Sequence, residues 1–172
     1  MTALYVITKY LTFPGAFLRC FWEQFMCKLF KLPIENNKCL QTNEMCGHIE
    51  HEMVDGKVKS FFFTFVPGFL TFLMGVVCLI PPVVDLLILN VSTTLLRIVC
   101  FVLLYFAVSM LTNIFPGIED AMVMWENYTE LGIGLKILFF LGAATMKIGA
   151  YCEKYTITFW TNFAIAALIL FL

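Results

Sequence analysis

Two ionisable residues, Arg19 and Glu23, lie inside the otherwise apolar segment FPGAFLRCFWE at residues 13–23. A charged side chain at the centre of a bilayer costs about 3 kcal/mol or more, so such residues normally have a partner. Residues four apart lie on one helix face, one turn from each other. The spacing predicts a bidentate ion pair between Arg19 and Glu23, which could be structural or belong to a functional site.

A second group with chemical potential is the stretch CGHIEHE at residues 46–52. In a turn or a helix His48 and His51 could converge on a metal ion, whereas in a strand they would point to opposite faces. Cys39 and Cys46 would add thiol ligands, but the spacing of these four residues matches no common zinc finger. Two histidines on the surface of a polar loop are the simpler interpretation.

The third group is the acidic pair Glu119 and Asp120, which follows Pro116 at the start of a predicted amphipathic helix over 117–130. Acidic residues in a first turn stabilise the helix dipole, which is a sufficient structural explanation. A functional role would need a cationic partner. Arg19 is the arginine that could supply one.

The composition identifies an integral membrane protein. Of 172 residues, 61% are hydrophobic and 13% are charged, where soluble domains average roughly 45–50% and about 25%. A net charge of -1 gives no reason to expect nucleic acid as a partner, and membrane lipid is the expected surrounding. The seven cysteines do not predict a disulfide framework, although Cys39 and Cys46 could pair in an oxidising compartment.

The apolar runs predict an all-α integral membrane fold in a single domain, residues 1–172, with four to five transmembrane helices. The predicted spans are 3–30, 60–80, 95–113, 131–150 and 157–172. Pro14 and Gly15 divide the first run into a short entry piece and a helix. The prolines at 81 and 82 are expected to end or kink the second span.

The polar segment 31–59 is predicted to be a small surface loop or hairpin, with turns at IENN and VDGK. Lysines are more frequent here than in the loops expected on the opposite side of the membrane. Basic residues favour the cytoplasmic side, so the segment is predicted to be cytoplasmic. The lysines in question are Lys28, Lys31, Lys38, Lys57 and Lys59.

Three short motifs occur in a recognisable order: FPGAFL directly before residue 19, GHIEH at 47–51, and NIFPGIED at 113–120. This order resembles the membrane-embedded zinc metalloproteases related to site-two protease. In that family FPG and three further residues precede an HExxH motif on a membrane helix, a loop with glycine and histidine follows, and a later segment supplies an aspartate. The resemblance covers about residues 10–125 and implies a plasma-membrane protein of a bacterium.

The departure from the family falls on its catalytic residues, because RCFWE at 19–23 stands in place of HExxH. The alignment puts Arg19 at the first zinc histidine, Cys20 at the general-base glutamate and Glu23 at the second histidine. Asp120 alone matches a family ligand by type. A guanidinium has no lone pair to offer a metal. The resemblance therefore implies a degenerate site, in which we expect Arg19 to replace the metal's charge and satisfy both Glu23 and Asp120.

The expected function is that of a pseudo-metalloprotease, a non-catalytic core that needs no cofactor and binds a membrane partner or a transmembrane peptide. One alternative is a metal-dependent membrane hydrolase with a rearranged site, for which zinc or iron would suit two histidines and two carboxylates. The ligands would then be Glu23, His48, His51 and Asp120. A further alternative is a structural subunit or assembly factor of a membrane complex.

Overall fold

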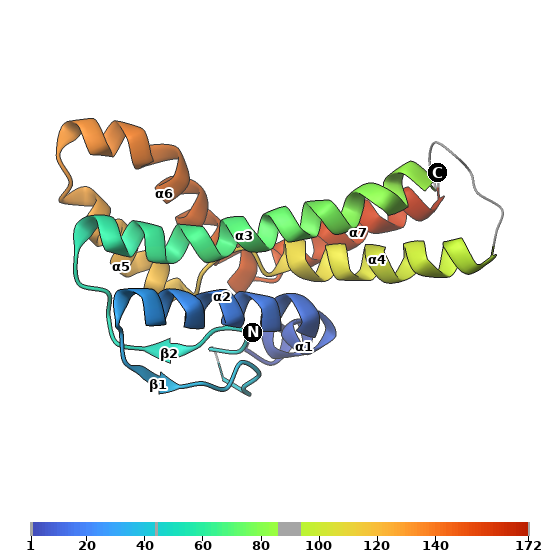
Figure 1. The fold of residues 1–172 in the computed structure, drawn as a ribbon, viewed down its shortest axis with the longest axis horizontal. Coiled ribbons are helices and arrows are strands. Elements are labelled where there is room, and N and C mark those ends of the chain that lie inside the picture. The colour runs from blue at the N-terminus through green and yellow to red at the C-terminus, as the bar shows by residue number, and fades with distance from the viewer. Residues whose placement is uncertain (1, 44, 86–93, 172) are drawn as a thin grey trace.

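The computed structural model describes residues 2–43, 45–85 and 94–171, and within them the chain is almost entirely helical (Figure 1). The elements are α1 (Thr2–Leu11), α2 (Phe13–Phe30), β1 (Ile34–Asn36), β2 (Glu50–His51), α3 (Lys57–Val83), α4 (Thr94–Thr112), α5 (Ile118–Thr129), α6 (Ile133–Lys154) and α7 (Ile157–Phe171). Among the described helices α3, α4 and α6 are long and apolar enough to cross a membrane. The predicted all-α membrane class is confirmed.

The first apolar segment differs from the single span predicted over 3–30, because it forms two helices that meet at Thr12. Pro14 lies in the first turn of α2, where its missing N–H removes no helical hydrogen bond. Neither helix has the length and composition of a membrane span. The reason is that α1 has ten residues, while α2 carries the charges of Arg19, Glu23 and Lys28.

Helix α3 is longer than the span predicted over 60–80, and it ends at Val83, the residue after Pro82, close to the predicted end. Pro67 lies in its middle, and Pro81 and Pro82 lie in its last turns. Pro67 cannot donate a backbone hydrogen bond, and its ring loosens the preceding turn. The hydroxyl of Thr71 donates to the Pro67 carbonyl at 2.8 Å. The second half of the helix packs beside α4 and α7 (Figure 1).

Helices α4 and α7 match the spans predicted over 95–113 and 157–172 to within one residue at each end. They contact each other through a small apolar cluster of Leu104, Ala166 and Ile169. The 15 residues of α7 extend roughly 22 Å, less than the hydrocarbon core of about 30 Å.

Helix α5 confirms the short amphipathic helix predicted over 117–130, and α6 begins and ends slightly later than the span predicted over 131–150. Phe61 of α3, Met124 and Tyr128 of α5 and Met146 of α6 form one buried cluster. This cluster attaches the α5–α6 pair to the first half of α3.

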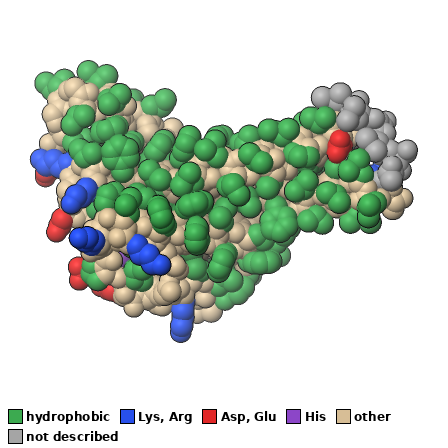
Figure 2. Space-filling model, viewed as in Figure 1, with side chains coloured by type: hydrophobic (Ala, Val, Ile, Leu, Met, Phe, Trp, Pro, Cys, Tyr) green, Lys and Arg blue, Asp and Glu red, His purple; other side chains and the backbone are tan. Residues whose placement is uncertain are grey.

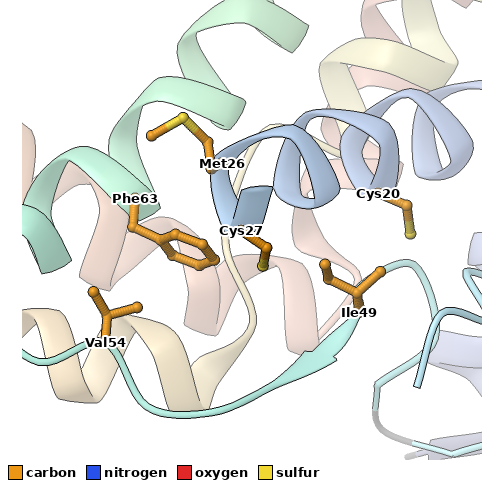
Figure 3. Packing of buried hydrophobic residues seen from close by; sticks show 6 residues of the cluster. All are labelled: Cys20, Met26, Cys27, Ile49, Val54 and Phe63. Atoms are coloured by element: carbon orange, nitrogen blue, oxygen red, sulfur yellow. The ribbon is translucent and has the colours of Figure 1, made fainter. Parts of the chain in front are cut away.

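The hairpin segment, residues 31–56 between α2 and α3, folds under α2. Its strands β1 and β2 are antiparallel, with Ile34 opposite His51, so the predicted hairpin is present. The predicted turn at IENN is wrong, because these residues form β1. Cys20, Met26 and Cys27 of α2 pack against Ile49 and Val54 of the hairpin segment and Phe63 of α3 (Figure 3).

The surface is consistent with a membrane environment. Hydrophobic side chains cover most of the face drawn in Figure 2, and most of its charged side chains gather at the end that holds α5 and the hairpin segment. Large apolar residues on α6, such as Ile137 and Leu141, are more than 70% exposed. In water, many exposed apolar side chains on one surface would favour association with other molecules. In a membrane, lipid can cover these side chains.

The start of α2 lies directly against α4. The Gly15 N–H donates to the Ser109 hydroxyl at 2.8 Å, and that hydroxyl donates to the Thr12 carbonyl at 2.8 Å. A Cβ on Gly15 would lie 2.1 Å from the backbone oxygen of Ser109. Only glycine therefore allows this helix contact.

We expect Gly15→Ala to destabilise the protein by about 1–3 kcal/mol, because the added methyl must push α2 and α4 apart. The measurement is the unfolding midpoint in a detergent titration. Gly134→Ala is the matched control, since a Cβ at that position on α6 meets nothing within 4 Å. Equal midpoints for the two variants would contradict the close helix contact.

Candidate functional site

Arg19 lies at the centre of a buried polar network, with 1% of its surface exposed. Its Nε donates to Glu23 Oε1 at 2.8 Å, so the predicted ion pair along α2 is present. The pair is not bidentate, because Nη1 donates to the Ile114 carbonyl at 2.7 Å and Nη2 to the Thr64 carbonyl at 3.4 Å. All three guanidinium nitrogens therefore have an acceptor.

The two backbone acceptors of Arg19 come from a loop and from helix α3. Ile114 lies between α4 and α5, and Thr64 lies in the turn of α3 that precedes Pro67. A Cβ on Gly68 would lie 2.4 Å from the Ile114 oxygen and 2.8 Å from Nη1 of Arg19. The absence of a side chain at Gly68 thus makes room for the guanidinium.

The carboxylate of Glu23 connects α2 to the hairpin segment. Its Oε1 also lies 2.9 Å from Nδ1 of His48, and its Oε2 accepts a hydrogen bond from the Ile49 N–H at 3.2 Å. His48 is buried, with 1% exposed. Glu23 therefore has three hydrogen-bond partners, two of which hold the hairpin segment in place.

A second buried ion pair, between Lys9 and Glu153, was not predicted. The Lys9 ammonium on α1 contacts Glu153 Oε1 and donates to Asn113 Oδ1 at 2.8 Å. Glu153 Oε2 accepts a hydrogen bond from the Phe115 N–H at 3.1 Å. Lys9 lies in an apolar run, as Arg19 does, and this signal could have singled it out. No local spacing could have paired it with a residue 144 positions away.

His48 lies between the two ion pairs. Its Nε2 is 3.5 Å from Glu153 Oε1, close enough for an electrostatic interaction but without hydrogen-bond geometry. Burial opposes protonation of the ring, but the charge of Glu23 and its hydrogen bond outweigh burial and raise the pKa of His48. With a neutral ring, two cations and two carboxylates balance, and the network carries no net charge.

Asp120 does not join this network. Its Oδ1 lies 3.5 Å from Nε2 of His51, while the contacts described for Arg19 are those to Glu23 and the two carbonyls. The expectation that Arg19 satisfies both Glu23 and Asp120 is therefore corrected. His51 supplies the charge for Asp120 because β2 brings the imidazole to the start of α5.

The His51–Asp120 pair lines a cleft of about 60 Å³ between the hairpin segment, α3 and α5. Its lining is mixed, with apolar Met53 and Phe63 beside polar Ser60 and the ion pair. Nδ1 of His51 lies 2.8 Å from the Glu52 carbonyl, to which it donates, and in the charged ring the Nε2 proton faces Asp120. Burial disfavours the charged ring, but the hydrogen bond and charge of Asp120 raise the pKa of His51 to about 9.

The four proposed metal ligands thus form two separate pairs, Glu23 with His48 and His51 with Asp120. In the described part of the chain no three His, Cys, Asp or Glu side chains converge in a way that could hold a metal ion. Cys20, predicted at the general-base position, is buried in the apolar cluster beneath α2. The site therefore consists of carboxylates paired with cationic or histidine side chains.

Comparison of the chain with known protein families, with curated proteins and with solved structures gives no match. The resemblance to site-two-protease-like enzymes stays a prediction from the motifs.

We expect Arg19→Met to destabilise the protein by about 3–5 kcal/mol, because it leaves Glu23 without its principal counter-ion in a buried site. Detergent unfolding would measure the loss. The double variant Arg19→Met/Glu23→Gln should lose less than the single one. Lys57→Met is the control, since it breaks an exposed pair with Glu130 and should cost about 0–1 kcal/mol. Unchanged stability of Arg19→Met would contradict the charge-balance role.

The His51–Asp120 pair should make stability depend on pH. The pKa of His51 rises from 6.5 in the unfolded chain to about 9 in the folded protein, so its contribution is complete below about pH 6.5 and is lost as the pH rises towards 9. The difference in unfolding temperature between wild type and Asp120→Asn, measured from pH 6 to pH 10, should shrink over this range. Glu119→Gln, the neighbouring acid, should show a constant difference from wild type.

Proposed function

We propose that this protein is a polytopic membrane protein with a degenerate, non-catalytic intramembrane-protease-like core that binds a membrane partner or a transmembrane peptide. The observation that supports a non-catalytic core is the neutralisation of both buried carboxylates by side-chain cations. Arg19 serves Glu23, and Lys9 serves Glu153. In a hydrolytic metal site the metal ion would supply this positive charge.

The hydrogen bonding of these groups also disfavours hydrolysis. A metal-dependent hydrolase keeps an open coordination position for water and a base that can accept its proton. Both oxygens of Glu23 are already occupied, by the side chains of Arg19 and His48 and by the Ile49 N–H. Using Glu23 as a ligand or a base would break contacts that hold the hairpin segment to α2.

The cleft beside the His51–Asp120 pair is the binding site that we propose. Met53 lies at its edge with 75% of its surface exposed, and Val54, Phe63 and Val123 extend the apolar lining. An apolar side chain of a partner could enter this lining while a polar backbone group meets the ion pair. The cleft is lined by residues of the hairpin segment, α3 and α5. Most charged side chains on the face drawn in Figure 2 gather at the end that holds the hairpin segment and α5, where a membrane-embedded partner would emerge from lipid.

We also infer the finer membrane arrangement. The three long helices α3, α4 and α6 would be joined by α7, and by the α1–α2 pair as a tilted fifth element, to give four to five membrane passes. The lysines around the hairpin segment favour its location in the cytoplasm. The motif resemblance favours the plasma membrane of a bacterium.

Photo-crosslinking tests the binding role. We expect a photoreactive residue at Met53 to form a crosslink to a defined membrane polypeptide, and one at Phe17 to give none above background. Phe17 is the matched control because it lies on α2 and is also exposed, at 64%. Equal yields from the two positions would contradict binding in the cleft. A stable stoichiometric complex that survives purification with both sites unreactive would favour the assembly-factor alternative.

Metal analysis tests the non-catalytic character. We expect the purified protein to contain well below one equivalent of zinc or iron per chain. One equivalent that is lost on His51→Ala would contradict the proposal and support the metal hydrolase with the rearranged ligands.

A further inference from the structure

Two residues with hydroxyl side chains line the cleft of the His51–Asp120 pair from α3. Ser60 and Thr64 lie one turn apart on this helix, and each has 2% of its surface exposed. Thr71 of the same helix donates to a backbone carbonyl one turn back. Within the described residues the hydroxyls of Ser60 and Thr64 make no such hydrogen bond. A buried hydroxyl without a partner costs free energy, so this pair favours an entering group that can form hydrogen bonds.

The start of α5 contributes two carboxylates to the same cleft. Oδ1 of Asp120 lies 3.5 Å from Nε2 of His51, and the neighbouring Glu119 is exposed. Among the residues that the structure describes, Glu119 has no ion-pair partner, and no lysine or arginine lines the cleft. Two carboxylates against one imidazolium leave one negative charge in excess even when His51 is charged. The polar part of the cleft is therefore complementary to a cation.

The rest of the lining is apolar. It consists of Met53 and Val54 of the hairpin segment, Phe63 of α3 and Val123 of α5. The cleft has a volume of about 60 Å³, whereas sites for whole small molecules usually have about 300 Å³ or more. It therefore has room for the end of one side chain, and a side chain that matches both parts of the lining combines an apolar stem with a cationic end.

We propose that the cleft binds the side chain of a single lysine on the membrane partner or transmembrane peptide of the proposed function, on which this inference rests. A lysine ammonium has three N–H donors and no acceptor, which suits carboxylate and hydroxyl oxygens. Its methylene stem can cover apolar surface while the charged end stays at polar groups. The stem would lie against Met53 and Phe63. The ammonium would donate to Glu119 and to the hydroxyls of Ser60 and Thr64.

Other cationic groups match the cleft less well. The amino terminus of a peptide has no apolar stem to cover the lining. An arginine guanidinium is larger than an ammonium and needs acceptors arranged in its own plane. Lysines are also frequent at the cytoplasmic ends of transmembrane helices, the side on which the hairpin segment is predicted. A partner that leaves the lipid there would present lysine at the level of the cleft.

Synthetic transmembrane peptides that differ in one residue test the proposal. The full chain with a photoreactive residue at Met53 is placed in phosphatidylcholine nanodiscs with a leucine–alanine helix that carries lysine, norleucine or glutamate just beyond its apolar stretch. Norleucine is lysine without the ammonium. Below saturation we expect the lysine peptide to crosslink about tenfold more than the norleucine peptide, the factor typical of hydrogen bonds to a charged group, and the glutamate peptide to crosslink least. Equal yields from lysine and norleucine would overturn the proposal.

Substitutions in the lining provide the controls. Glu119→Gln and the double variant Ser60→Ala/Thr64→Ala should each lower the ratio of lysine to norleucine crosslinking several-fold, because each removes acceptors of the ammonium. Glu126→Gln is the matched control, since Glu126 is an exposed acid on the same helix α5 and does not line the cleft. A ratio that is the same in all three variants as in the parent chain would overturn the proposal.

The unsubstituted chain provides a second measurement. n-Butylammonium chloride, a lysine side chain without its backbone, should shift the methyl NMR signal of Met53 saturably, whereas n-butanol and sodium chloride should not; an equal shift with n-butanol would overturn the preference for a cation. Failure of this inference is distinguishable from failure of the proposed function. A cell-membrane polypeptide crosslinked at Met53, together with equal yields from the lysine and norleucine peptides, would overturn the lysine site and leave the proposed function intact. A preference for lysine without such a polypeptide would support the lysine site and contradict the proposed function.

Discussion

The fold requires that two buried cations, Lys9 on α1 and Arg19 on α2, are neutralised inside an otherwise apolar protein. Arg19 and Lys9 are each almost fully buried, and a lone buried cation would cost several kcal/mol. Their carboxylate partners, Glu23 and Glu153, come from α2 and α6, and His48 of the hairpin segment lies between them. One charge balance therefore fixes the relative positions of four separate parts of the chain.

Close backbone approach makes this convergence possible. Gly15 allows α2 to touch α4, and Gly68 leaves room for the guanidinium beside the Ile114 carbonyl. The Thr64 carbonyl of α3 completes the guanidinium's hydrogen bonding. Two glycines therefore supply the close helix contact and the space that the buried guanidinium needs.

The sequence predicted those features that are local. Long apolar runs indicated the helices, and the four-residue spacing indicated the contact between Arg19 and Glu23. The partner of Lys9 and the pairing of His48 with Glu23 depend on contacts between distant segments, which no local pattern contains. The expected role of Asp120 was wrong for the same reason, since only the folded hairpin segment shows that His51 is its neighbour.

The separation of 144 residues between Lys9 and Glu153 has a consequence for biosynthesis. A ribosome completes α1 long before it makes the end of α6, so while the intervening segments are made the ammonium of Lys9 lacks the carboxylate of Glu153. Until then α1 is better accommodated at the water interface than in the hydrocarbon core. Helix α1 would thus be among the last of the described elements to reach its final position, although it is made before the others.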